Sequence, residues 1–130
     1  MFWQKKTVVA GCPLVILLLF VFGWHHDLFH TTAYYDVFMH VLGGGFLVIT
    51  LAGIGWHGGL KYRTARRVHP ARIKATLAAG LVLSSIAWEI FEVIFNLTPN
   101  WTQSVGDTVS DMICAWVGGA VALHYIRPEN

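Results

Sequence analysis

The stretch Thr7–Trp24, TVVAGCPLVILLLFVFGW, decides the fold because its 18 residues carry no charge. A helix of that length can cross the hydrocarbon core of a bilayer, which is ~30 Å thick. The whole chain of 130 residues is 55% hydrophobic and only 12% charged. Soluble domains carry about twice that share of charged residues, roughly 25%. The composition therefore excludes a soluble enzyme, a disordered chain and a nucleic-acid binder, and it predicts an integral membrane protein.

Three further apolar segments follow the first one, and each is long enough to cross a membrane. The second contains glycines at 43–45, 53 and 55, a density typical of membrane helices that approach each other closely. We therefore predict an all-α fold, a bundle of four transmembrane helices that forms one integral membrane domain over residues 1–130. The predicted spans are residues 7–24, 36–56, 73–97 and 104–126.

The basic residues predict how this bundle is oriented. Lys5 and Lys6 precede the first span, six more Lys and Arg lie within residues 61–74, and Arg127 follows the fourth span. With four spans, all nine Lys and Arg residues fall on one side of the membrane. By the positive-inside rule that side is the cytoplasm. The sequence thus predicts cytoplasmic N- and C-termini and, for a bacterial protein, a place in the inner membrane.

Ionisable residues inside the predicted spans are the strongest indication of function, because each costs at least ~2.5 to 3.5 kcal/mol to insert. They come in pairs three or four positions apart, so each pair shares one face of its helix. At ~1.5 Å rise per residue, all three pairs fall in the outer third of the membrane. We therefore predict one shared site, open to the exterior. The pairs are Asp36 with His40, Glu89 with Glu92, and Asp107 with Asp111.

Every Lys and Arg is predicted at the opposite face, so protonated carboxyls, a histidinium or a bound metal must balance these acids. Carboxylates with one imidazole suit Mg²⁺, Mn²⁺, Ca²⁺ or iron better than structural zinc. We expect a divalent metal ion, Mg, Mn, Fe or Zn, with Glu89 as general base and Asp36 as a supporting residue. Single acids that hydrogen-bond a neighbouring helix are the alternative. The expected ligands are His40, Glu92, Asp107 and Asp111.

These motifs also resemble a known family. The segments Asp36-Val-Phe-Met-His40, Trp88-Glu-Ile-Phe-Glu92 and Gly106-Asp-Thr-Val-Ser-Asp111 resemble the YjdF-like bacterial membrane proteins, which are distantly similar to VanZ-like proteins linked to glycopeptide resistance. The resemblance covers the second to fourth spans and implies a membrane protein without an established reaction. YjdF-like relatives commonly have more than four spans. The glutamine and arginine that usually follow the central glutamate of VanZ-like proteins are missing here, which argues against a glycopeptide-related function.

Three functions fit this sequence. The first is a metal-dependent hydrolase that acts on a lipid or phosphate-bearing group at the outer leaflet, with Glu89 activating water. The second is a cation-binding or proton-binding sensor. The third is a non-enzymatic accessory subunit of a larger membrane complex, whose acids hold helices together. The expected partners are the lipid bilayer and either a second copy of the chain or other membrane subunits.

Overall fold

The computed structural model describes residues 4–60, 70–95 and 105–126, and within these ranges every regular element is helical. The prediction of an all-α fold is therefore confirmed. The four long helices coincide with the four predicted segments to within three residues at each end. The connection between the first two predicted spans is described and contains a short helix, whereas residues 61–69 and 96–104 lie outside the described residues. The elements are α1 (Lys6–His25), α2 (Leu28–Thr31), α3 (Ala33–Gly55), η2 (Trp56–Leu60), α5 (Pro70–Phe95) and α6 (Val105–Tyr125).

Three helical segments within the described residues are long and apolar enough to cross a membrane: Lys6–His25, Tyr34–Gly58 and Ala71–Phe95. The helix α6 has 21 residues and is not among these three segments, and its first two turns carry two aspartates. Many large apolar side chains are exposed on the outside of the molecule. In α1, for example, Leu14 is 55% and Leu18 is 59% exposed. Continuous apolar surface of this kind needs a lipid environment, so the protein is an integral membrane protein.

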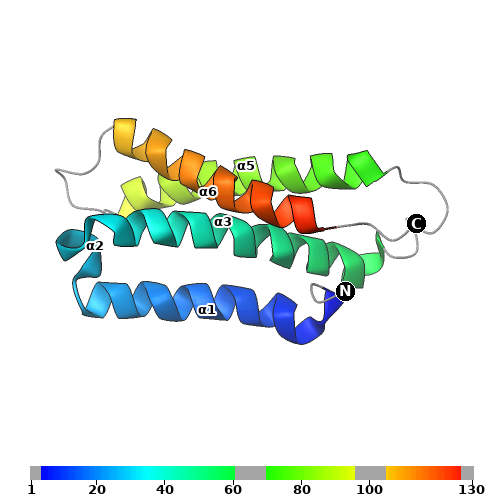
Figure 1. Ribbon diagram of the computed structural model, residues 1–130, viewed down its shortest axis with the longest axis horizontal. Coiled ribbons are helices and arrows are strands. Elements are labelled where there is room, and N and C mark those ends of the chain that lie inside the picture. The colour runs from blue at the N-terminus through cyan, green and yellow to red at the C-terminus, as the bar shows by residue number, and fades with distance from the viewer. Residues whose placement is uncertain (1–3, 61–69, 96–104, 127–130) are drawn as a thin grey trace.

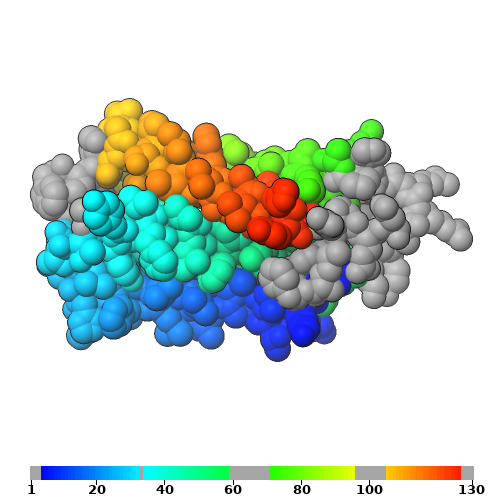
Figure 2. Space-filling view, in the orientation of Figure 1, coloured from blue at the N-terminus to red at the C-terminus, as the bar shows by residue number. Residues whose placement is uncertain are grey.

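The helix α3 holds the arrangement together. It lies in the middle of the four long helices and contacts α1, α5 and α6 (Figure 1). The helices α3 and α6 run in the same direction, and α5 runs in the opposite direction. In the space-filling view, side chains of α6 lie directly against those of α3 (Figure 2). The start of α1 and the end of α6 therefore lie at one end of the molecule, and α2 lies at the other end.

Two glycines allow α3 and α6 to pack backbone against backbone. A Cβ atom on Gly44 would collide with the carbonyl group of Ala115, and one on Gly118 would collide with the carbonyl group of Val41. Small residues at such crossings are how membrane helices come into close contact. This crossing also brings the first turns of α6 close to the first turns of α3, where the acids lie.

The interior has an apolar half and a polar half. At the end where α5 begins, an apolar core forms among α3, α5 and the residue that follows α6. Arg72 and Lys74 lie in the first turns of α5, and Lys74 precedes Glu89 by fifteen positions, which is about 22 Å along the helix. The apolar core consists of Val48, Ala52, Leu77, Leu81 and Ile126. The buried polar residues are Ser85, Glu89, Glu92 and Asp111.

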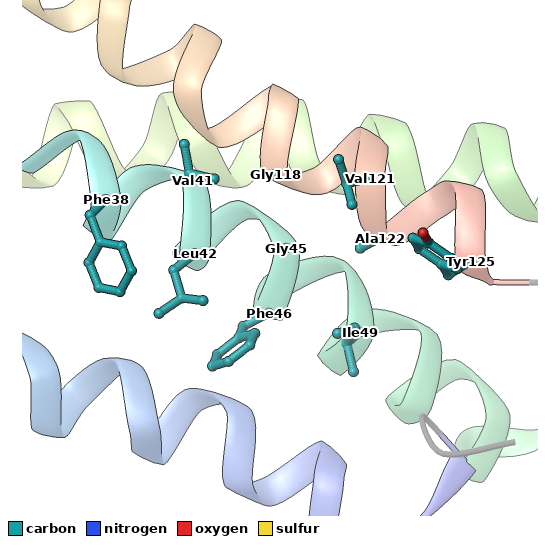
Figure 3. Close-up of a pocket in the computed structure, with 10 residues that line it drawn as sticks. All are labelled: Phe38, Val41, Leu42, Gly45, Phe46, Ile49, Gly118, Val121, Ala122 and Tyr125. Carbon is teal, nitrogen blue, oxygen red and sulfur yellow. The ribbon is translucent and has the colours of Figure 1, made fainter.

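An apolar groove runs between α3 and α6 on the outside of the bundle (Figure 3), with a cavity volume of about 450 Å³. Its lining residues Phe38 and Leu42 each follow an acid or histidine of α3 by two positions. Two positions correspond to a rotation of ~200° around a helix. The groove therefore lies on the face of α3 opposite to the one that carries Asp36 and His40, and it does not form part of the polar site.

Candidate functional site

His40 lies at the centre of the polar half. Its Nε2 atom is 3.5 Å from Asp36 Oδ1 and 3.7 Å from Asp111 Oδ2. Asp36 precedes His40 by one turn on α3 and shares its face, whereas Asp111 is brought in by the close crossing of α6. The His40 side chain is only 10% exposed, so its neighbours, and not bulk water, determine its interactions.

The structure places four carboxylates from three helices around this histidine. They form two groups that share His40: one with Asp36 and Asp111, and the other with Glu89 and Glu92. Within each group the possible ligand atoms all lie within 4.8 Å of one another. Oxygen ligands bind Mg²⁺ or Ca²⁺ at about 2.0 to 2.6 Å, so two ligands of one ion are at most ~4 to 5 Å apart. The spacing within each group is therefore compatible with the binding of one divalent cation.

The distances between His40 and the two aspartates are compatible both with an ion pair and with shared coordination of a cation. Distances of 3.5 and 3.7 Å to the two aspartates exceed the ~2.7 to 3.2 Å of a good N–H···O hydrogen bond. They lie within the separation that two ligands of one cation can have. The same distances also suit a protonated His40 that pairs directly with both aspartates.

Burial makes the negative charge of this cluster costly. Glu89, Glu92 and Asp111 are between 4% and 9% exposed. Within the described residues, the ion pairs of Asp36 and Asp111 are both with His40, and the described Lys and Arg residues lie at the other end of the helices. Buried carboxylates are strongly destabilising unless an opposite charge or a metal compensates them. A protonated His40 or a bound cation would meet this requirement.

Two donors outside the cluster hold its glutamates. Trp88 Nε1 donates a hydrogen bond to Glu92 Oε1 at 2.7 Å, and the Thr108 side chain hydrogen-bonds to Glu89. Neither donor is among the predicted site residues. The spacing of four positions between Trp88 and Glu92 is a signal that could have found the first donor. No sequence signal points to Thr108, because its contact depends on how α6 lies against α5.

The structure brings together most of the predicted site residues. His40, Glu92 and Asp111, predicted as ligands, belong to the two groups, and so do Asp36, predicted as a supporting residue, and Glu89, predicted as the base. Asp107 is the exception among the predicted ligands. It lies half-buried in the first turn of α6 and belongs to neither group. The role of each residue stays a prediction.

This fold and this cluster define the class: an all-helical integral membrane protein with a buried cluster of carboxylates around a histidine. The chain belongs to the family described as "Predicted membrane protein (DUF2238)", which matches residues 3–128. No curated protein and no solved structure matches the chain. The description of the family agrees with the membrane protein that the sequence predicts.

Proposed function

We propose that this protein binds a divalent cation at the outer end of its helix bundle. The observation that carries the proposal is the position of His40, within ion-binding reach of carboxylates from α3, α5 and α6. A set of several carboxylate oxygens and one imidazole nitrogen favours Mg²⁺, Mn²⁺ or Fe²⁺ over structural Zn²⁺. The proposed ligands and supporting residues are Asp36, His40, Glu89, Glu92 and Asp111, with Asp107 as a predicted ligand outside the two groups.

The proposal includes a topology of four membrane spans. The helix α6 is 21 residues long, which corresponds to ~31 Å and equals the thickness of a hydrocarbon core. It packs against the full-length span α3, and its Asp111 lies 3.7 Å from His40 instead of facing lipid. The basic residues then favour cytoplasmic termini and an inner-membrane location, which places the cation site toward the exterior.

Among the described residues, the exposure of the side chains indicates that the proposed site opens toward one end of the bundle. Asp36 has a side chain that is 31% exposed, against 10% for His40, so Asp36 lies at the entrance. In the other direction Ser85 is the next buried polar residue on α5, and one turn beyond it the core residue Leu81 is 4% exposed. Since apolar side chains fill the bundle beyond that level, the arrangement favours binding from one side over movement of an ion across the membrane.

Hydrolysis of a lipid or phosphate-bearing group at the outer leaflet is the activity that we propose for this site. When bound, a divalent cation polarises a substrate oxygen or makes a bound water more acidic. Glu89, oriented by its hydrogen bond with Thr108, would accept the proton as general base. The described Lys and Arg residues lie at the other end of the bundle. The charge of a phosphate would therefore have to be met by the cation.

A non-enzymatic role is the alternative. If the acids only join the helices to one another or to a partner, the protein is an accessory subunit of a larger membrane complex or a homo-oligomer. If they bind ions without chemistry, it is a cation or proton sensor. The motifs resemble those of YjdF-like proteins, and this resemblance stays a prediction. Because YjdF-like proteins have no established reaction, the resemblance does not distinguish among these functions.

The metal content of the purified protein tests the proposal. We expect detergent-purified wild type to contain stoichiometric metal by elemental mass spectrometry and the double variant Asp111→Asn, Glu92→Gln to have lost it. The matched control is Asp27→Asn, which removes a carboxylate of the same kind that is 64% exposed near α2, and it should keep the metal. Wild type that holds no metal after incubation with Mg²⁺, Mn²⁺, Fe²⁺ and Zn²⁺ would contradict the proposal and favour the accessory role.

A further inference from the structure

Trp88 forms a hydrogen bond with a member of the acid cluster. Its Nε1 atom donates to Glu92 Oε1 at 2.7 Å. An indole can donate but cannot accept, so this oxygen of Glu92 must be the acceptor. A carboxylate has two oxygens with several lone pairs, so one hydrogen bond fixes the plane of the group and leaves capacity for a cation.

The indole is itself held by aromatic neighbours on two helices. Phe20 of α1 meets the Trp88 ring edge-on with ring centres 6.1 Å apart, and Phe91 of α5 lies 5.6 Å from it. Such aromatic pairs restrict the orientation of both rings. Trp88 is 40% exposed while Glu92 is 8% exposed, so the indole lies at the edge of the bundle and reaches inward to the carboxylate. Through this ring, α1 is linked to a site whose other members come from α3, α5 and α6.

We propose that Trp88 is a positioning residue that orients Glu92 for cation binding. This inference rests on the proposed function, because it assigns a role within the same cation site. Partners of metal ligands generally set the orientation and basicity of the ligand, and their loss weakens metal binding by about 10- to 100-fold. The same role is expected for Trp88 although the indole never touches the ion.

The chain offers a matched control for this test. Trp116 also donates a hydrogen bond through Nε1, but to the hydroxyl of Ser85 at 3.0 Å, and not to a carboxylate. We expect full-length Trp88→Phe in detergent to bind Mn²⁺ about tenfold more weakly than wild type by equilibrium dialysis. Trp116→Phe, which loses a ring of the same size and the same donor, should bind Mn²⁺ as wild type does.

A double-variant cycle separates positioning from packing. If Trp88 acts through Glu92, then Trp88→Phe should change nothing further once Glu92→Ala has removed the carboxylate, so the two losses are not additive. The group of Asp36, His40 and Asp111 is intact in both backgrounds and keeps residual binding measurable. Additive losses, or a Trp88→Phe variant with wild-type affinity, would overturn the role of Trp88 alone. Wild type that binds no Mn²⁺ would overturn the cation site and this inference together.

Discussion

His40 is the residue on which the proposed cation site depends, because it is the one member that both groups share. Its imidazole nitrogen lies between the carboxylates of α3 and α6, and the glutamates of α5 complete the second group. A change at any one acid removes a ligand from a single group, whereas a change at His40 removes a ligand from both. The site should therefore be most sensitive at this position.

We predict that His40→Ala lowers Mn²⁺ affinity by more than about 100-fold, which is above the range for losing an outer partner of a ligand. Asp107→Asn should cause a smaller loss, because Asp107 lies outside both groups. Equilibrium dialysis of the two variants beside wild type measures the difference. Equal losses would show that Asp107 ligates the ion as directly as His40 does.

At the residue scale, the sequence predicts which side chains share a level in the membrane but not which of them meet. Position along a helix axis follows from residue number, so the common depth of Asp36, Glu92 and Asp111 could be predicted. Contact also depends on how each helix is rotated and on its crossing angle. That is why Asp107, one turn from Asp111, lies outside the groups, and why the donor Thr108 could not be predicted.

At the scale of elements, the crossing of α3 and α6 positions the site. The helices meet at Gly44 and Gly118, where each glycine lies against a backbone carbonyl of the other helix. A backbone carbonyl within a helix cannot rotate away as the tip of a flexible side chain can. Any side chain at these positions must therefore push the helices apart, which moves Asp111 away from His40.

We predict that Gly44→Ala destabilises the protein by about 1 to 3 kcal/mol, the usual cost of overpacking, and also weakens Mn²⁺ binding. The neighbouring Gly43→Ala is the matched control, since a Cβ atom there meets nothing within 4 Å. It should be neutral or slightly stabilising, because alanine is the better helix former. Unfolding in denaturing detergent and Mn²⁺ dialysis measure both effects. A Gly44→Ala variant as stable as Gly43→Ala would contradict the backbone contact.

The sequence predicts the long helices well and the short ones not at all. Apolar runs of about twenty residues determine α1, α3, α5 and α6, because the thickness of a membrane sets the length of each span. The helix α2 has four residues and begins after Asp27, which has a positive φ of 55°. The π-helical turn η2 continues α3 through Trp56–Leu60. Neither is long enough to produce a periodic pattern of apolar residues.

For the molecule as a whole, a cation at the end of the bundle would join three helices. A ligand that binds only the folded state raises its stability, by about 2.7 kcal/mol when the ligand is present at 100 times its Kd. We therefore predict that saturating Mn²⁺ raises the unfolding temperature of wild type but not that of the Asp111→Asn, Glu92→Gln variant. Thermal unfolding with and without Mn²⁺ tests this, and an equal rise in both proteins would place the bound ion elsewhere.

The topology of the whole molecule decides on which side of the membrane the site opens. With four spans and cytoplasmic termini, residues near α2 face the exterior, while the start of α5 and the C-terminal end face the cytoplasm. With α6 outside the membrane, the C-terminal end would face the exterior, on the same side as α2. A single cysteine at position 129 therefore distinguishes three spans from four.

We predict that a membrane-impermeant maleimide added to intact bacterial cells labels His30→Cys and does not label Lys74→Cys or Glu129→Cys. Each variant is made after Cys12 and Cys114 have been replaced by alanine, and permeabilised cells give the full labelling of each site. His30 is suitable because it is exposed in α2. Labelling of both Glu129→Cys and His30→Cys would show that the chain crosses the membrane three times and not four. Labelling of both Lys74→Cys and Glu129→Cys without labelling of His30→Cys would show that the bundle has the opposite orientation. The acids would then face the cytoplasm, and a substrate in the outer leaflet could not reach them.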